Sequence, residues 1–222
     1  AASSGLQLDL VLYSSQLSER GNTLLEQLRN RGVPIEEVQA QILENLSDTE
    51  TSQGILAVLP IPAAVLPISW DLILVLDRLR DPGNLGTILR SSAASGVQAV
   101  VLTPSTTDPF APKVVRAAMG AQFYLPIVSM TWPEIIEACR ERKPSPAAIL
   151  VADSAGGMPC WQTDLKQPTA LVIGSEADGP QPEAYQAADA LLHIPMPGRA
   201  ESLNAAVAAS ILLYEIARQR NS

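Results

Sequence analysis

Three short segments of the chain combine polar side chains with glycine and could act together as a chemical site. The first, residues 81–90 (DPGNLGTILR), follows an apolar run and opens a predicted helix. We expect Asn84 to cap this helix by accepting a backbone N–H, and Gly86 to let another backbone or a ligand come close. Arg90 follows Asn84 by under two helical turns, so both are expected at one crevice beside the carboxyl ends of the strands. The alternative is a capped helix with a solvated arginine.

The second segment, residues 174–179 (GSEADG), directly follows the apolar run 171–173. Glycine at both ends suits a tight loop whose exposed backbone N–H groups bind polar atoms of a ligand, and Glu176 lies between the two glycines. Taken alone, the same pattern fits an ordinary strand-to-helix turn with a solvated carboxylate. A dinucleotide-binding turn is less well supported, because the GxGxxG pattern is absent.

The third segment is IPMPG at residues 194–198, followed by ESLN at residues 201–204. Its two prolines cannot donate sheet hydrogen bonds, so an irregular loop is expected. Ser202 is predicted to cap the last helix, with Asn204 in the first turn of that helix. Taken alone, the segment is a loop and a cap, with Met196 as a core residue.

The elements around these segments predict an α/β fold. Short, fully apolar runs alternate with helical patterns, which indicates a parallel sheet covered by helices on both faces. The expected strands are residues 72–77, 97–102, 123–128, 147–151, 170–173 and 190–194, and the expected helices are residues 85–95, 114–119, 132–142 and 202–218.

A proline-rich stretch separates a small N-terminal part from this pattern. Residues 59–67 (LPIPAAVLP) hold three prolines, which stiffen the chain and interrupt both helix and sheet. We therefore predict an N-terminal domain at residues 1–60, a linker at 61–70 and a larger domain at 71–222. The small domain should contain a helix at 22–29 and a strand at 54–59, while residues 38–46 are ambiguous.

Composition and charge limit the functions that the chain can have. Hydrophobic residues make up 47% of the 222 residues, enough for a core, and the apolar runs are too short for a membrane span. Two distant cysteines and a single histidine predict neither a metal site nor a disulfide framework. The net charge is −8, with −5 in residues 1–70 and −3 in residues 71–222. Any nucleic-acid contact must therefore use a local basic patch and weaken steeply with salt.

Taken together, in this order and at these strand ends, the three segments resemble the SpoU (TrmH) family of the SPOUT class of RNA methyltransferases. The resemblance covers residues 71–222, and residues 116–121 (RAAMGA) add a further family-like segment. The matching patterns are NxGxxxR, GxExxG and IPMxG followed by SLN, carried by Asn84, Gly86 and Arg90, by Gly174, Glu176 and Gly179, and by residues 194–198 and 202–204.

The resemblance implies a C-terminal deep trefoil knot, a rare exception to the rule against threaded chains. It also implies S-adenosyl-L-methionine as cofactor, held at Gly174, Ile194 and Leu203 with Met196 nearby. A homodimer through the knot region is expected, in which both subunits complete each site. No metal and no membrane partner are expected, and the location is expected to be cytoplasmic.

The implied activity is methyl transfer to a ribose 2′-hydroxyl in structured RNA, with ribosomal RNA favoured over transfer RNA. The resemblance makes Arg90 the catalytic residue. A guanidinium rarely gives up a proton, so we expect it to act as an electrostatic clamp on the 2′-oxygen or the adjacent phosphate. Glu176 is expected to orient Arg90 or Asn84, while Ser202 and Asn204 shape the site.

The N-terminal domain carries a further, shorter part of the resemblance. Residues 49–58 (TETSQGILAV) look like the end of the family's RNA-binding domain, which is similar to the ribosomal L30e protein. The stretch before them fits poorly, and the sequence leaves open whether this domain is complete at its start.

Three other functions compete with this prediction. A catalytically inactive knotted RNA-binding or ribosome-assembly protein is disfavoured by the intact Arg90, Glu176 and Asn204. A nucleotide-binding dehydrogenase is disfavoured because this sequence lacks the GxGxxG glycine pattern of such enzymes. Base methylation by a related knotted enzyme is disfavoured by the asparagine and arginine of the first segment.

Overall fold

The computed structural model describes residues 7–46, 53–154, 156–199 and 201–221. The chain divides into two compact units, Ala1–Ala63 and Ala64–Ser222. Each unit has its own hydrophobic core, so each is described by itself.

The smaller unit is a three-stranded mixed sheet with two helices. Its strands are β1 (Leu10–Tyr13), β2 (Ile35–Glu37) and β3 (Ile55–Val58), and its helices are α1 (Glu19–Asn30) and α2 (Ala40–Leu46). The central strand β1 pairs in parallel with β2 and antiparallel with β3. The helix expected at 22–29 begins earlier, because Ser18 caps it by accepting the N–H of Gly21.

This unit is a small α/β fold, as expected. The ambiguous residues 38–46 are largely helical, and β1 and β2 were not predicted. Within the segment that resembles the end of the RNA-binding domain, residues 49–52 lie outside the described residues. The likeness to L30e stays a prediction.

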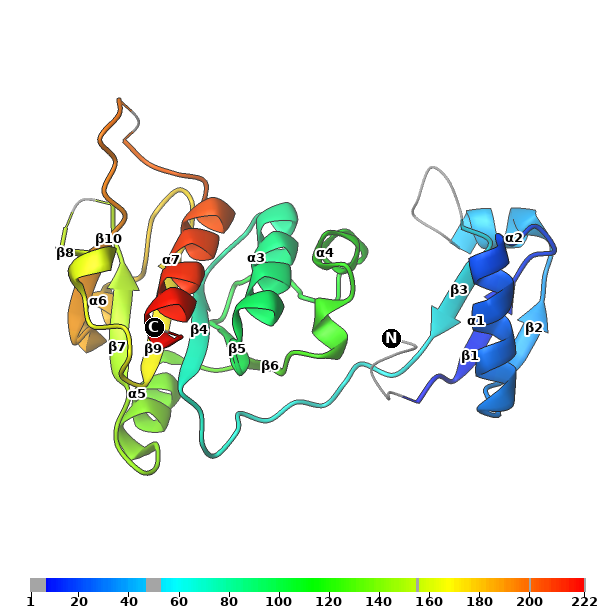
Figure 1. Cartoon of the computed structure of the whole chain (residues 1–222), viewed down its shortest axis with the longest axis horizontal. Helices are drawn as coiled ribbons and strands as arrows, with labels where there is room; N and C mark the ends of the chain where they lie inside the picture. Colours follow the sequence, from blue (N-terminus) through cyan, green and yellow to red (C-terminus); the bar gives the residue numbers. More distant parts are fainter. Residues whose placement is uncertain (1–6, 47–52, 155, 200, 222) are drawn as a thin grey trace. The chain divides into compact units, whose positions relative to one another are not determined.

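The larger unit is built on a seven-stranded sheet in which every neighbouring pair of strands is parallel. The spatial order is β6-β5-β4-β9-β7-β10-β8, so the first strand of the unit lies inside the sheet (Figure 1). The strands are β4 (Leu72–Asp77), β5 (Ala99–Leu102), β6 (Ile127–Ser129), β7 (Ala148–Ala152), β8 (Met158–Pro159), β9 (Thr169–Gly174) and β10 (Ala190–His193).

Helices cover both faces of this sheet. In β4, the side chains of Leu72, Leu74 and Leu76 enter one core, and those of Ile73 and Val75 enter another. The first core is covered by α3 (Pro82–Ser95), α4 (Pro112–Ala118) and α7 (Ala205–Arg220), and the second by α5 (Trp132–Glu141) and α6 (Pro182–Ala187). Figure 1 shows α3 between α4 and α7, both of which it contacts. The predicted parallel α/β fold is confirmed.

Both predicted helix caps are wrong. Asp81, not Asn84, caps α3: its carboxylate accepts the N–H of Asn84, and Pro82 occupies the first helical position. Likewise, α7 is capped by Asn204 rather than by Ser202, because the Asn204 side chain accepts N–H bonds from the first turn. Both asparagines therefore lie at helix starts, but only Asn204 caps its helix.

The strand expected at 123–128 is wrong in its first half. Residues Ala121–Phe123 form a 3-10 turn, and only β6 (Ile127–Ser129) continues the sheet. Pro126 stands between them and lacks the N–H that a strand needs. The short elements β8, α6 and the 3-10 turn Cys160–Gln162 were not predicted. The knot stays a prediction.

Among the described residues, no helix has both the length and the apolar character that crossing a membrane requires.

Candidate active site

A cavity of about 520 Å³ opens at the carboxyl ends of β7, β9 and β10. Its walls come from the segments that follow these three strands and from the first turns of α7. Each segment follows a strand that is paired within the sheet, so the sheet fixes where the segment begins. Of the predicted site residues, seven line this cavity: Gly174, Glu176, Ile194, Met196, Ser202, Leu203 and Asn204.

A chain of side-chain hydrogen bonds joins the three segments singled out in the sequence. Asn84 Nδ2 donates to Oε1 of Glu176 at 2.8 Å, and Asn204 Nδ2 donates to Oδ1 of Asn84 at 2.9 Å. Asn204 Oδ1 meanwhile accepts the first N–H groups of α7. Asn84 does not line the cavity, but it is bonded to two residues that do. The structure therefore brings residues 84, 176 and 204 together.

The glycine-flanked loop is folded tightly over the end of β9. Ser175 and Gly179 exchange two backbone hydrogen bonds, of 3.2 and 3.0 Å. A Cβ atom at Gly174 would lie 2.1 Å from the nitrogen of Pro180, a distance that no side chain can occupy. Glycine is required there because the returning backbone passes directly over it.

A buried carboxylate anchors the far end of this loop. Asp77 closes β4 and is fully buried. Its Oδ2 accepts the backbone N–H of Gln181 at 2.6 Å, and its Oδ1 accepts Gln181 Nε2 at 2.5 Å and Thr103 Oγ1 at 2.9 Å. Sequence reasoning treated Asp77 only as the end of a strand. The structure shows that it ties the cavity loop to two central strands.

Three further cavity residues were missed. Tyr185 of α6 donates its hydroxyl hydrogen to Asp153 Oδ2 at 2.7 Å, and both line the cavity together with His193. Burial, followed by the bond to Asp153, raises the pKa of Tyr185 to about 12, so the phenol stays protonated as the donor. The signal for Asp153 was present in the sequence, as an acid directly after a buried strand.

Arg90 lies outside the cavity of its own chain. It is exposed on α3, about 9 Å further along the helix axis than Asn84 for six residues of α-helix. Six residues also rotate the side chain by about 240°, so the two do not share a helix face. Within the described chain, Asn84 is bonded to residues of the cavity and Arg90 is not among its lining residues, so the catalytic role of Arg90 stays a prediction.

Comparison with known families identifies the chain. Residues 71–214 match the SpoU rRNA Methylase family, and residues 4–63 match the family described as RNA 2'-O ribose methyltransferase substrate binding. The first match covers well over half of the chain. The chain therefore belongs to the SpoU methylase family, and the resemblance inferred from its motifs is confirmed.

Individual relatives agree with this assignment. The chain is 36% identical over 171 residues to the 23S rRNA (guanosine(2553)-2'-O)-methyltransferase RlmP of Bacillus subtilis, covering 77% of this chain and 67% of the relative. It is 33% identical over 231 residues to a 23S rRNA (uridine(2479)-2'-O)-methyltransferase of Streptomyces viridochromogenes, covering 100% of this chain and 80% of the relative. The crystal structure of the SpoU methyltransferase AviRb from that organism, in complex with AdoMet, superposes with a TM-score of 0.88 at 31% identity, covering 100% and 86% of the two chains.

The cavity suits S-adenosylmethionine on its own chemistry. Its volume is within the range of about 300–1,000 Å³ that is usual for small-ligand sites. Its lining holds two carboxylates, Asp153 and Glu176, and no lysine or arginine. Aliphatic side chains of β9, β10 and α7 form an apolar part of the lining, beside neutral polar side chains such as Ser202 and Asn204. A partly apolar cavity with acidic groups favours a ligand that has apolar parts and also carries cationic groups, as S-adenosylmethionine does in its sulfonium and ammonium.

Proposed function

We propose that the protein transfers a methyl group from S-adenosylmethionine to a ribose 2′-hydroxyl of structured RNA, with ribosomal RNA as the substrate. The observation that carries this function is the bonded chain of Asn84, Glu176 and Asn204 beside a cavity suited to the cofactor. The rRNA methyltransferases among its relatives favour ribosomal over transfer RNA.

When bound, S-adenosylmethionine supplies an electrophilic methyl group. Gly174, Ile194, Met196 and Leu203 are the residues that would hold it, because they line the cavity and belong to the matching motifs. The protein must then align the hydroxyl and stabilise the charge that develops on its oxygen. We assign the second task to Arg90, whose planar guanidinium suits an oxyanion and its adjacent phosphate.

Arg90 requires a second subunit in this proposal. Leu203 and the α7 residues Val207, Ile211 and Tyr214 leave an apolar stripe exposed along the last helix, beside α3. Such a stripe is typical of a self-complementary interface. A homodimer through α7 would cover it and would carry Arg90 of one subunit to the cavity of its partner.

Transfer of tritium from labelled cofactor to ribosomal RNA, followed by nucleoside analysis, tests the activity. We expect label in a 2′-O-methyl nucleoside. Label in a methylated base would contradict ribose as the acceptor. Cofactor binding without transfer to ribosomal or transfer RNA would favour the alternative, a catalytically inactive knotted RNA-binding or ribosome-assembly protein.

Subunit mixing tests the role and placement of Arg90. Arg90→Ala should abolish transfer while calorimetry still detects cofactor binding, and Arg90→Lys should also fail because the bidentate geometry is lost. Arg90→Ala mixed with Glu176→Ala should regain about a quarter of wild-type transfer, since half of randomly mixed dimers hold one complete site. No recovery, despite confirmed subunit exchange, would show that Arg90 does not act across a dimer.

The remaining assignments complete the proposal. We place an L30e-like RNA-binding domain at residues 1–60, a linker at 61–70 and the methyltransferase domain at 71–222; the substrate-binding family match at 4–63 supports the first.

A cytoplasmic location fits the two cysteines, which are free and buried. Burial raises the pKa of Cys139 to about 12, so its thiol is unreactive. Among the described residues, no group of three or more His, Cys, Asp or Glu side chains forms a metal site.

A further inference from the structure

Charge is distributed very unevenly along this acidic chain. Residues 78–116 carry five basic side chains and two acidic ones, a net +3, although the whole chain is −8. The rest of the chain is therefore −11. The five basic residues are Arg78, Arg80, Arg90, Lys113 and Arg116.

The two acids of this segment serve the backbone within it. Asp81 accepts the N–H of Asn84 as the cap of α3, and Asp108 accepts the N–H of Phe110. Neither forms a salt bridge with the five basic side chains among the described residues. The basic charges therefore remain available to an external anion.

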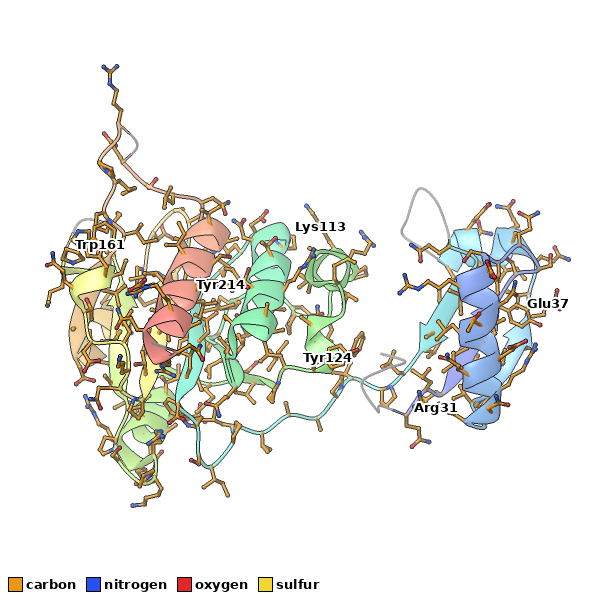
Figure 2. All side chains as sticks on the ribbon, in the orientation of Figure 1. Arg31, Glu37, Lys113, Tyr124, Trp161 and Tyr214 are labelled. Carbon is orange, nitrogen blue, oxygen red and sulfur yellow. The ribbon has the colours of Figure 1, made fainter. Side chains whose placement is uncertain are left out.

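The fold brings the elements that carry these charges together. Thr107 binds the β4–α3 segment by donating its N–H to Leu79 O at 2.9 Å and its hydroxyl to Arg80 O at 2.6 Å. Helices α3 and α4 pack closely at Gly86, where a Cβ would lie 2.7 Å from Val114 O. On α4, Lys113 and Arg116 are exposed and three residues apart, so they share a helix face. Figure 2 shows Lys113 projecting from the end of α4.

Arg78 gives a second, independent indication of an anion. Its backbone has φ of 56°, a left-handed conformation that is unusual for a residue other than glycine, at the carboxyl end of β4. Its Nε is buried and has no hydrogen-bond partner among the described residues. The residue as a whole is only half-buried, so its charge, which no acceptor at Nε compensates, can still meet a phosphate at the surface.

We propose that Arg78, Arg80, Lys113 and Arg116, which we call the basic surface, bind phosphate groups of the RNA and lead the strand toward Arg90. This inference rests on the proposed function, because it takes RNA as the partner. It assigns the electrostatic part of RNA capture to the methyltransferase domain, and not to the N-terminal unit, whose residues 1–63 hold three basic and eight acidic side chains.

The salt dependence of RNA binding tests this surface in the full chain. Binding of labelled total bacterial ribosomal RNA would be measured by filter retention between about 50 and 200 mM KCl. The double variant Lys113→Gln/Arg116→Gln should weaken binding and reduce the slope of log K against log[salt] by about 2, about 1 per lost phosphate contact. The matched control Lys143→Gln/Lys166→Gln removes two exposed charges elsewhere and should leave the slope unchanged.

Two more variants complete the design. Lys113→Arg keeps the positive charge, so this variant should keep the wild-type slope of log K against log[salt]. Arg20→Gln, on α1 of the N-terminal unit, should have no effect. The proposal is overturned if Lys113→Gln/Arg116→Gln keeps the wild-type slope, if the control pair lowers it equally, or if Arg20→Gln produces the loss. Absence of methyl transfer by the wild-type protein would instead refute the proposed function, so the two failures are distinguishable.

Discussion

Replacing Asp77 with alanine should loosen the loop that forms one wall of the cavity. The carboxylate is fully buried and accepts three hydrogen bonds, two from Gln181 and one from Thr103. Bonds to a charged group contribute about 1.5–3 kcal/mol each, and orphaning a buried donor costs about 1–3 kcal/mol. Removing the buried charge recovers part of this, so we expect a net loss of about 3–5 kcal/mol.

In a chain of this length, 1 kcal/mol shifts Tm by about 2–4 °C, so Asp77→Ala should melt about 10 °C below the wild type. Cofactor affinity should fall as well, because Gln181 holds the end of the loop that contains Glu176. The melting temperature of Asp77→Asn should lie between those of the wild type and Asp77→Ala. The asparagine oxygen can still accept the Gln181 N–H, and the Gln181 side-chain amide can rotate.

Scanning calorimetry and titration with S-adenosylmethionine measure these effects. The control is Asp178→Ala, which removes an exposed carboxylate from the same loop and should change stability by less than about 0.5 kcal/mol. If Asp77→Ala had the same melting temperature and the same cofactor affinity as the control, the anchoring role assigned to Asp77 would be refuted.

Three further changes test other contacts. Asn84→Asp replaces the donor to Glu176 with a second carboxylate, so transfer should fall about 10- to 100-fold for a lost charge-assisted bond of 1.5–3 kcal/mol; unchanged initial rates would contradict the bonded chain. Arg218 donates to Glu215 and holds the pKa of Glu215 at about 2, below its ordinary 4.5, so this stabilisation is present above pH 4.5 and is lost as the pH falls toward 2. The difference in unfolding free energy between the wild type and Glu215→Gln should therefore shrink over that window, and a difference independent of pH would refute the pairing. Gly86→Ala places a methyl group against α4 and should destabilise by about 1–3 kcal/mol in thermal melts; a neutral result would mean that the two helices can separate at no cost.

The fold was largely predictable because the buried strands can be recognised in the sequence as continuous apolar runs. A strand buried on both faces is apolar along nearly all of its length, so runs such as 72–77, apolar up to its final Asp77, and 170–173 were identified correctly. The first half of the strand predicted at 123–128 was wrong because Phe123 has a strand-like side chain, while Pro126 prevents continuous pairing. Short elements such as β8 carry too few residues to show any period.

The candidate site was predictable as a set of segments but not as a set of contacts. Residue types marked Glu176 and Asn204 as polar groups at strand and helix ends, and both line the cavity. Nothing in the local sequence could show that Asn84 bonds to both of them, because such pairing depends on how distant loops converge. The role of Asp77 could not be predicted either, because its partners Gln181 and Thr103 are distant in the sequence. An Asp at the end of a strand usually indicates only a turn.

The interior position of β4 in the sheet has a consequence for biosynthesis. In the register of the sheet, Leu72 faces Thr169, roughly a hundred residues later in the chain. A ribosome adds about 5–20 residues per second, so β4 must wait roughly 5–20 s for the strand that closes one of its edges. During that interval β5 can pair with only one edge of β4, so the other edge keeps unpaired backbone groups that could pair with another molecule.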